Sequence, residues 1–452
     1  MIHAAYTPST TAVGSSLALT ALLGLLPLVV FFVLLGVFKV KTHVCAIISL
    51  AAALAAAILA FGMPVDLALL SATQGAAFGL FPIVYIVIMA VWLYNLTEKT
   101  GRSEDVRRVF AAVGKGDMRV QALLIGFCFC GLMEGLAGFG APVAISCAML
   151  LALGVPAIKA ALVTMVGNAL NVCFGAMAIP VTTAAKLGNS STDAVGATQG
   201  RITPLFLCWI PVLLLGILDG KRGMKQAWPA ALAAGVTMGL GHILAANFLS
   251  YELTAVFASL LSFASVTLLL RAWHPRTPEE QMSETSSEKL SGSRVALGLL
   301  PYWLVVVIFA VAKLWTAGID VPKALESADV TFGWPGLDGQ LVDAKGQAVK
   351  ATQFTFSWLS SPGTMLLLTG LIVTLVYGKS SSGGKYPFSF GKGMTTLWKT
   401  VADLKLAILT IAVVMALAYV MNFSGQTVAI GTWLAAAGGA FAFLSPILGW
   451  VG

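Results

Sequence analysis

Residues 120–154 form an apolar run of 35 residues in which Glu134 is the only charge. At about 1.5 Å per residue, an unbroken helix of this length would reach roughly 50 Å, whereas the hydrocarbon core of a bilayer is about 30 Å thick. The middle of the run, residues 131–145, carries four glycines and Pro142, which weaken or break a helix. The sequence therefore predicts two half-helices, roughly 120–134 and 142–153, joined by a loop at membrane depth.

Irregular backbone inside a membrane is tolerated only where it is buried in protein or lines a cavity. An ionisable residue at such a position is a functional-site hypothesis by default, and discontinuous helices form the substrate sites of many transporters. The region around Glu134 is accordingly the first candidate site.

The composition of the whole chain also indicates a membrane protein. Of its 452 residues, 58% are hydrophobic and only 10% are charged, which is typical of an all-α, polytopic membrane protein. We expect about 11–13 hydrophobic segments. Twelve apolar runs are long enough to span the membrane, at 17–38, 44–62, 67–96, 120–154, 156–181, 202–218, 227–249, 253–273, 295–315, 364–377, 404–422 and 428–452.

The loop charges predict how these segments are oriented. Nineteen of the 27 basic residues fall in one set of alternate loops and five in the other set. The positive-inside rule places the first set in the cytoplasm and the N-terminus outside. With that orientation, either the broken region or the following run, 156–181, does not fully cross the membrane.

Several shorter patterns predict further features. The run 67–96 is also too long for one straight span, and its glycines and Pro82 indicate a kink. Loop 97–119 is predicted to form an amphipathic helix, and the alternation at 353–357 indicates a strand or hairpin. The polar segment 274–294 is predicted to be a cytoplasmic linker between an N-terminal half, 1–273, and a C-terminal half, 295–452.

Other residue types exclude competing classes of protein. The six cysteines show no paired spacing and the four histidines are scattered, so neither a disulfide nor a metal site is expected. No HExxH motif occurs, and residues 378–380 lack the first glycine of a phosphate-binding loop, Val373 standing in its place. We therefore expect no enzyme activity, no cofactor and no nucleic-acid partner.

Several long and unusual segments between residue 90 and the end resemble the bacterial lactate permease family. They include WLYNLTEKTG at 92–101, EGLAGFGAPVAI at 134–145, FGAMAIP at 174–180, DGKRGMK at 219–225 and AYVMNFSG at 418–425, with shorter matches at 126–129, 228–230, 445–446 and 449–450. The first and last of the longer segments also lie on spans of opposite predicted direction. Such an echo is what inverted repeats would leave.

The resemblance implies a multi-pass symporter of the bacterial inner membrane that moves L-lactate with protons, with D-lactate and glycolate as further substrates. Two departures stand out. Members commonly have NTAPVAFG where this chain reads NALNVCFG at 168–175, and they usually continue beyond the Gly-Trp pair near the end of this chain. We therefore expect a C-terminal truncation. Three alternatives remain: a channel, a carrier for another small carboxylate, or a fragment that does not transport.

A monocarboxylate needs hydrogen-bond donors in a place of low dielectric constant. The half-helix starting near Ala141 would offer unpaired N–H groups, and Gly135, Gly138 and Gly140 would let the backbone approach an anion. Burial favours the protonated form of Glu134, beside which an anion could bind, so Glu134 is the predicted proton-coupling residue. Its alternative role is to join the two half-helices through hydrogen bonds.

Three more polar residues are candidate substrate ligands. Asn168 and Asn171 are predicted to share a helix face in an apolar segment, where they could line the cavity or simply hydrogen-bond between helices. Arg201 is predicted at the external mouth, either as a first contact for the carboxylate or as a cation at the membrane interface. The oligomeric state is not predicted.

Overall fold

A computed structural model describes residues 5–114, 116–136, 138, 141–188, 190–282, 291–315, 319–342, 346–382, 384–436 and 438–440. The predicted all-α fold is confirmed: in these residues nine helices are long and apolar enough to cross a membrane. A further pair, Ala157–Asn168 and Val172–Lys186, is bent by 59°. The chain divides into two compact units, residues 1–85, 329–357 and 403–452 (unit 1) and residues 86–328 and 358–402 (unit 2). Each unit contains segments from both sides of 274–294, and the division into sequential halves stays a prediction.

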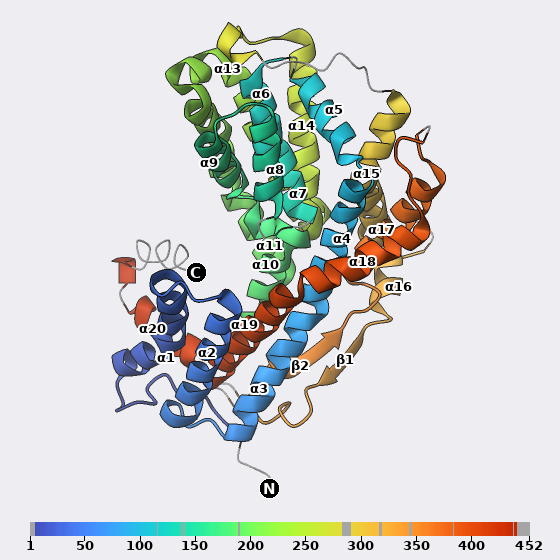
Figure 1. The fold of residues 1–452 in the computed structure, drawn as a ribbon. Helices are drawn as coiled ribbons and strands as arrows, with labels where there is room; N and C mark the ends of the chain where they lie inside the picture. The colour runs from blue at the N-terminus through green and yellow to red at the C-terminus, as the bar shows by residue number, and fades with distance from the viewer. Residues whose placement is uncertain are drawn as a thin grey trace. The chain divides into compact units, whose positions relative to one another are not determined.

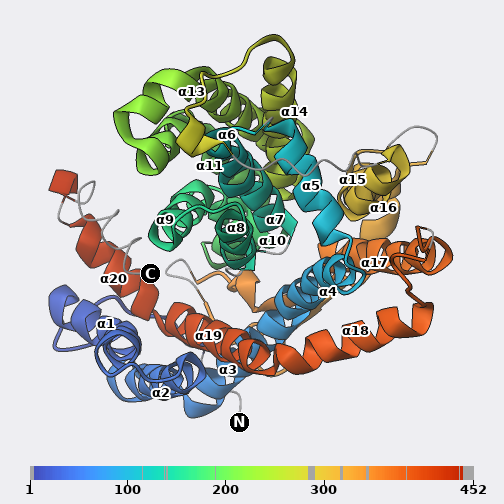
Figure 2. The same ribbon diagram turned by 45° about the horizontal axis from the view of Figure 1, so that its top comes forward.

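Unit 1 is a helical group with one small hairpin. Helix α19 packs against α2 and α3, and α1 packs against α2 and α20 (Figures 1 and 2). Its helices are α1 (Leu17–Phe32), α2 (Thr42–Ala55), α3 (Val65–Phe78), α19 (Lys405–Ser424) and α20 (Gln426–Ala435), with π-helical turns at Val33–Val37, Ala56–Ala60 and Gly79–Val84. The predicted kink is present, because Phe81 has extended backbone inside the last of these turns.

The predicted hairpin is also confirmed. Strand β1 (Val330–Gly333) pairs antiparallel with β2 (Gln353–Phe356), and Phe332 lies opposite Phe354 in the register. Phe332, Trp334 and Phe354 pack together, with ring centroids 5.6 Å apart for two of the pairs. These aromatic contacts across the strands hold the two short strands together.

Unit 2 contains the broken region. It carries α4 (Tyr85–Lys99), α5 (Ser103–Val113), α6 (Met118–Leu123), α7 (Cys130–Leu136), α8 (Ala141–Ala152), α9 (Ala157–Asn168), α10 (Gly175–Leu187), α11 (Thr192–Ile202), α12 (Pro204–Leu207), α13 (Ile210–Leu244), α14 (Thr254–Ala272), α15 (Gly292–Leu314), α16 (Val321–Glu326), α17 (Pro362–Lys379) and α18 (Phe390–Asp403). Helix α5 is the amphipathic helix predicted in loop 97–119. Helices α13 and α14 lie against the α6–α7 segment, with α8 and α9 beside it (Figures 1 and 2).

The two predicted half-helices are present at nearly the predicted bounds. The first is α6, the π-helical turn Leu124–Phe129 and α7; the second is α8. Residues 119–136 of the first half-helix are buried. Gly138 has a φ of +57°, a conformation that favours glycine, so the chain turns sharply between α7 and α8. Residues 137, 139 and 140 lie outside the described part, and Gly140 with them.

A buried ionic cluster fixes the start of the first half-helix. Asp117 caps α6 by accepting hydrogen bonds from the N–H groups of Arg119 and Val120. The Arg119 guanidinium is fully buried and contacts Asp117 at 2.8 Å and Asp219 at 2.9 Å. Asp219 lies at a kink in α13, where Gly220 has a φ of +58°. The cluster therefore ties α6 to the bend in α13.

Candidate functional site

Glu134 lies near the end of α7 and is only 3% exposed. Its Oε2 accepts a hydrogen bond of 2.8 Å from Nδ2 of Asn168, the last residue of α9. The other side of the same amide accepts a hydrogen bond from the Cys130 thiol, 3.6 Å away and one turn before Glu134. Two residues that the sequence singled out independently are thus in direct contact, and Asn168 links α9 to α7.

The backbone at Gly138 and at Gly175 comes very close to its neighbours around Glu134. A Cβ added to Gly175 would overlap Oε1 of Glu134, and one added to Gly138 would lie 3.1 Å from the backbone nitrogen of Ala176. A Cβ at Gly175 would thus require the carboxylate to move, and one at Gly138 would crowd the backbone of α10. The space beside the carboxylate is therefore set by the start of α10 as well as by α7.

Helix α10 begins with a left-handed turn. Ala176, Met177 and Ala178 have φ values of 44°, 57° and 58°, and all three side chains are buried. Left-handed helical geometry costs L-residues roughly 1–2 kcal/mol each. Such strain persists only where contacts with the surrounding structure hold the backbone in place, as they do at many binding sites and switches. Here the turn packs directly against Gly138, four residues beyond Glu134.

A second polar chain begins at Asn171, three residues after Asn168. Its Oδ1 lies 3.2 Å from Nε2 of His242 on α13, and Nδ1 of His242 lies 3.0 Å from Oγ1 of Thr203. All three residues are buried, His242 completely. Both amides thus make hydrogen bonds to neighbouring helices, which is one of the two roles predicted for them. The predicted shared helix face is wrong, because α9 ends at Asn168 and Asn171 lies in the turn that follows it. His242 was missed, although an ionisable side chain inside the apolar run 227–249 was visible in the sequence.

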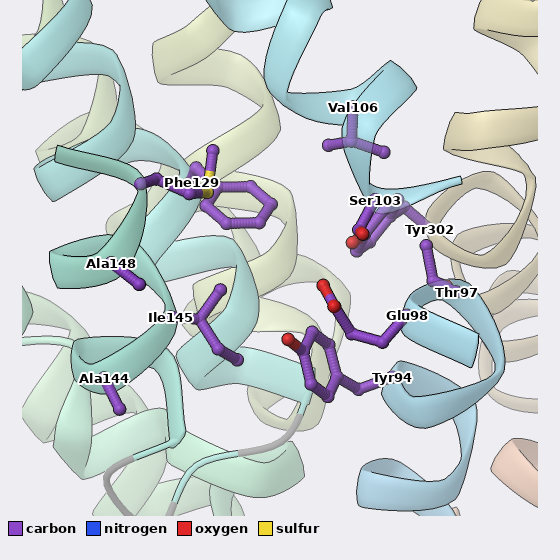
Figure 3. Close-up of a pocket in the computed structure, with 11 residues that line it drawn as sticks. Tyr94, Thr97, Glu98, Ser103, Val106, Phe129, Ala144, Ile145, Ala148 and Tyr302 are labelled. Carbon is purple, nitrogen blue, oxygen red and sulfur yellow. The ribbon is translucent and has the colours of Figure 1, made fainter. Parts of the chain in front are cut away.

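A cavity of about 280 Å³ lies in unit 2 on another side of the first half-helix (Figure 3). Its wall combines side chains of α4, α5, the π-helical turn, α8 and α15. The lining residues are Tyr94, Thr97, Glu98, Ser103, Val106, Phe129, Ala144, Ile145, Ala148, Met149 and Tyr302. Sequence reasoning did not single out any of these side chains as a ligand. In the sequence, Glu98 stands beside Lys99 and has the pattern of an ordinary charge at the end of a helix.

The remaining predicted ligands lie in different places. Arg201 is exposed at the end of α11 and donates a hydrogen bond of 2.7 Å to Asn247; its contacts do not include Glu134. Gly135 faces α14, where a Cβ would come within 3.0 Å of Ala255 and Val256. Ala141 is the first residue of α8. The structure thus groups Glu134, Gly138 and Asn168, and places Arg201 apart.

Comparison with known proteins decides the family. A family model described as L-lactate permease matches residues 20–452. This chain belongs to the L-lactate permease family. Among curated members, the L-lactate permease of Bacillus subtilis is 35% identical over 99% of this chain and 82% of its own length.

Two relatives from Escherichia coli K12 are named for different substrates. Glycolate permease GlcA and L-lactate permease are each 34% identical to this family member, over 96% of the chain and 80% of the relative. No solved structure matches the chain. Across the described residues of this permease, no group of three or more histidine, cysteine, aspartate or glutamate side chains could hold a metal ion.

Proposed function

We propose that this permease takes up L-lactate, and the smaller 2-hydroxy acid glycolate, by proton symport across the bacterial inner membrane with its N-terminus outside. Its membership of the family and the names of its relatives support the choice of substrate. The observation that carries proton coupling is the contact between Glu134 and Asn168, because it holds a lone carboxylate at a buried break between half-helices.

The coupling follows from the charge of Glu134. An ionised Glu134 repels a carboxylate brought close to it in a place of low dielectric constant. A proton on Glu134 removes that repulsion and permits the anion to bind to N–H groups at the start of α8. Gly138 and Ala141, the first residue of α8, would form the backbone of this site. Loss of the proton on the cytoplasmic side would then expel the anion.

The polar residues near the break have separate roles in this proposal. Asn168 positions the Glu134 carboxylate through its 2.8 Å hydrogen bond. Asn171, whose Nδ2 is buried without a hydrogen-bond partner in the described structure, would supply a donor to the substrate carboxylate. Arg201, exposed at the end of α11, would attract anions at the external side.

The proposal is tested by uptake of labelled L-lactate in a host that lacks its own carriers. We expect Glu134→Gln to abolish uphill accumulation and its sensitivity to a protonophore, while exchange of internal for external lactate continues. Glu252→Gln is the matched control, because Glu252 is also buried, at 5% exposure, but lies between α13 and α14. Uphill accumulation at the wild-type level in Glu134→Gln would refute the coupling role.

A further inference from the structure

The cavity in Figure 3 has two chemically different walls. Along α4 and α5 it presents the Tyr94 hydroxyl, the Glu98 carboxylate and the Ser103 hydroxyl. Opposite them lie Ile145 and Ala148 of α8, which can contact only apolar groups. A ligand that fits such a cavity has an alkyl face and a polar face.

The polar wall also specifies hydrogen-bond roles. Glu98 is exposed, and its carboxylate points into the cavity beside the Tyr94 hydroxyl (Figure 3). An ionised carboxylate only accepts hydrogen bonds, whereas tyrosine and serine hydroxyls can donate them. A ligand with a hydrogen-bond donor for Glu98 and an acceptor for the Tyr94 or Ser103 hydroxyl would match this wall. At about 280 Å³ the cavity is just below the roughly 300–1,000 Å³ typical of sites for drug-sized ligands, so the ligand is small.

We propose that this cavity is a second binding site for the transported 2-hydroxy acid, and that Glu98 accepts a hydrogen bond from its 2-hydroxyl group. Tyr94 and Ser103 donate to the substrate carboxylate, and Ile145 and Ala148 contact the alkyl group. This inference rests on the proposed function for its choice of ligand, but the site is distinct from Glu134, which does not line the cavity.

The negative charge of Glu98 suits release more than capture. It repels the substrate carboxylate and so weakens binding of any monocarboxylate, while its hydrogen bond to the hydroxyl favours 2-hydroxy acids over the others. Glu98 is next to last in α4, at the end that the loop charges assign to the cytoplasm. The cavity would thus hold the substrate on its way out to the cytoplasm.

Binding of labelled L-lactate to the purified full chain in detergent, with propionate and glycolate as competitors, tests this site. Propionate keeps the methyl group and lacks the hydroxyl, and glycolate does the reverse. Because a hydrogen bond to a charged group contributes about 1.5–3 kcal/mol, we expect Glu98→Leu to reduce the affinity ratio of lactate to propionate by about tenfold or more. The ratio is the readout, since loss of the charge affects both acids alike.

Three further variants separate the possible causes. Glu98→Gln keeps a neutral acceptor, so it should strengthen binding of both acids and keep most of the ratio. Glu104→Gln is the matched control, since Glu104 pairs with Arg108 on α5 and does not line the cavity; it should change nothing. Ala148→Phe fills the cavity and should weaken binding of all three acids.

An unchanged ratio in Glu98→Leu, or unchanged lactate binding in Ala148→Phe, would overturn the inference. So would a wild-type chain that binds no lactate. If the ratio falls as expected but intact cells accumulate no lactate, the site stands and the proposed transport function fails. If the binding ratio is unchanged in Glu98→Leu while cells still accumulate lactate, the transport function stands and this site is wrong.

Discussion

Replacing Arg119 by methionine removes the centre of the ionic cluster at the start of α6. The Arg119 side chain has no solvent exposure, and it donates to Asp117, Asp219, Gln226 and the carbonyl of Arg276 at 2.8–3.2 Å. Methionine fills similar space but donates no hydrogen bond. The variant therefore leaves Asp117, 3% exposed, without its cationic partner.

The expected cost follows from burial. Removing one partner of a buried ion pair costs about 3–5 kcal/mol, because the other charge stays buried and uncompensated. Arg222 provides the matched comparison, since it contacts the same Asp219 at 2.8 Å but its own side chain is 41% exposed. An exposed pair contributes only about 0–1 kcal/mol. The two variants should thus differ by roughly 3 kcal/mol although each removes one arginine.

Thermal unfolding of the purified chain in detergent measures this difference. At roughly 2 °C per kcal/mol, the lower end of the range for long chains, Arg119→Met should lower Tm by roughly 6–10 °C and Arg222→Met by no more than about 2 °C. In the double variant Arg119→Met with Asp219→Asn, the losses should be clearly less than additive. Equal Tm losses in the two arginine variants would refute the argument that burial sets the strength of this cluster.

Three further predictions use other parts of the chain. Gly175→Ala should reduce lactate uptake strongly with little loss of expression, as measured by transport in cells, because its Cβ would displace the Glu134 carboxylate. Gly75→Ala should lower stability by about 1–3 kcal/mol in a detergent melt, because its Cβ would overlap the carbonyl oxygen of Met415. Burial raises the pKa of Tyr6 from 10 to about 12, so its contribution to stability should be present below pH 10 and lost as the pH rises through about 12; the melting temperature of Tyr6→Phe should lack that alkaline step.

The break at residues 131–145 could be predicted because it depends on local facts. A run of 35 apolar residues exceeds the membrane thickness, and glycine and proline weaken a helix wherever they occur. The kink near Pro82 and the strand at 353–356 follow from equally local patterns. The π-helical turn Leu124–Phe129 was not predicted, since no residue type in it distinguishes a π-turn from an α-helix.

The site depends on contacts between distant segments, and there the sequence is less informative. Glu134 and Asn168 were each candidates because polar groups in apolar segments are costly, yet their contact spans 34 residues and the sequence does not specify it. His242 was equally conspicuous, but its partner Asn171 is 71 residues away. A buried polar residue can thus be recognised from sequence, whereas its partner requires the fold.

Glu98, in contrast, could not be recognised from the sequence as a residue of a site. A carboxylate at the end of a helix, beside a lysine, has the pattern of a solvated charge, and only the approach of α8 turns its surroundings into a cavity.

The two carboxylates also differ in access: Glu134 is buried and Glu98 is exposed. Symport requires one group that holds a proton away from water and a path by which substrate reaches water. The first half-helix borders both places, through Glu134 on α7 and through Phe129 in the cavity wall.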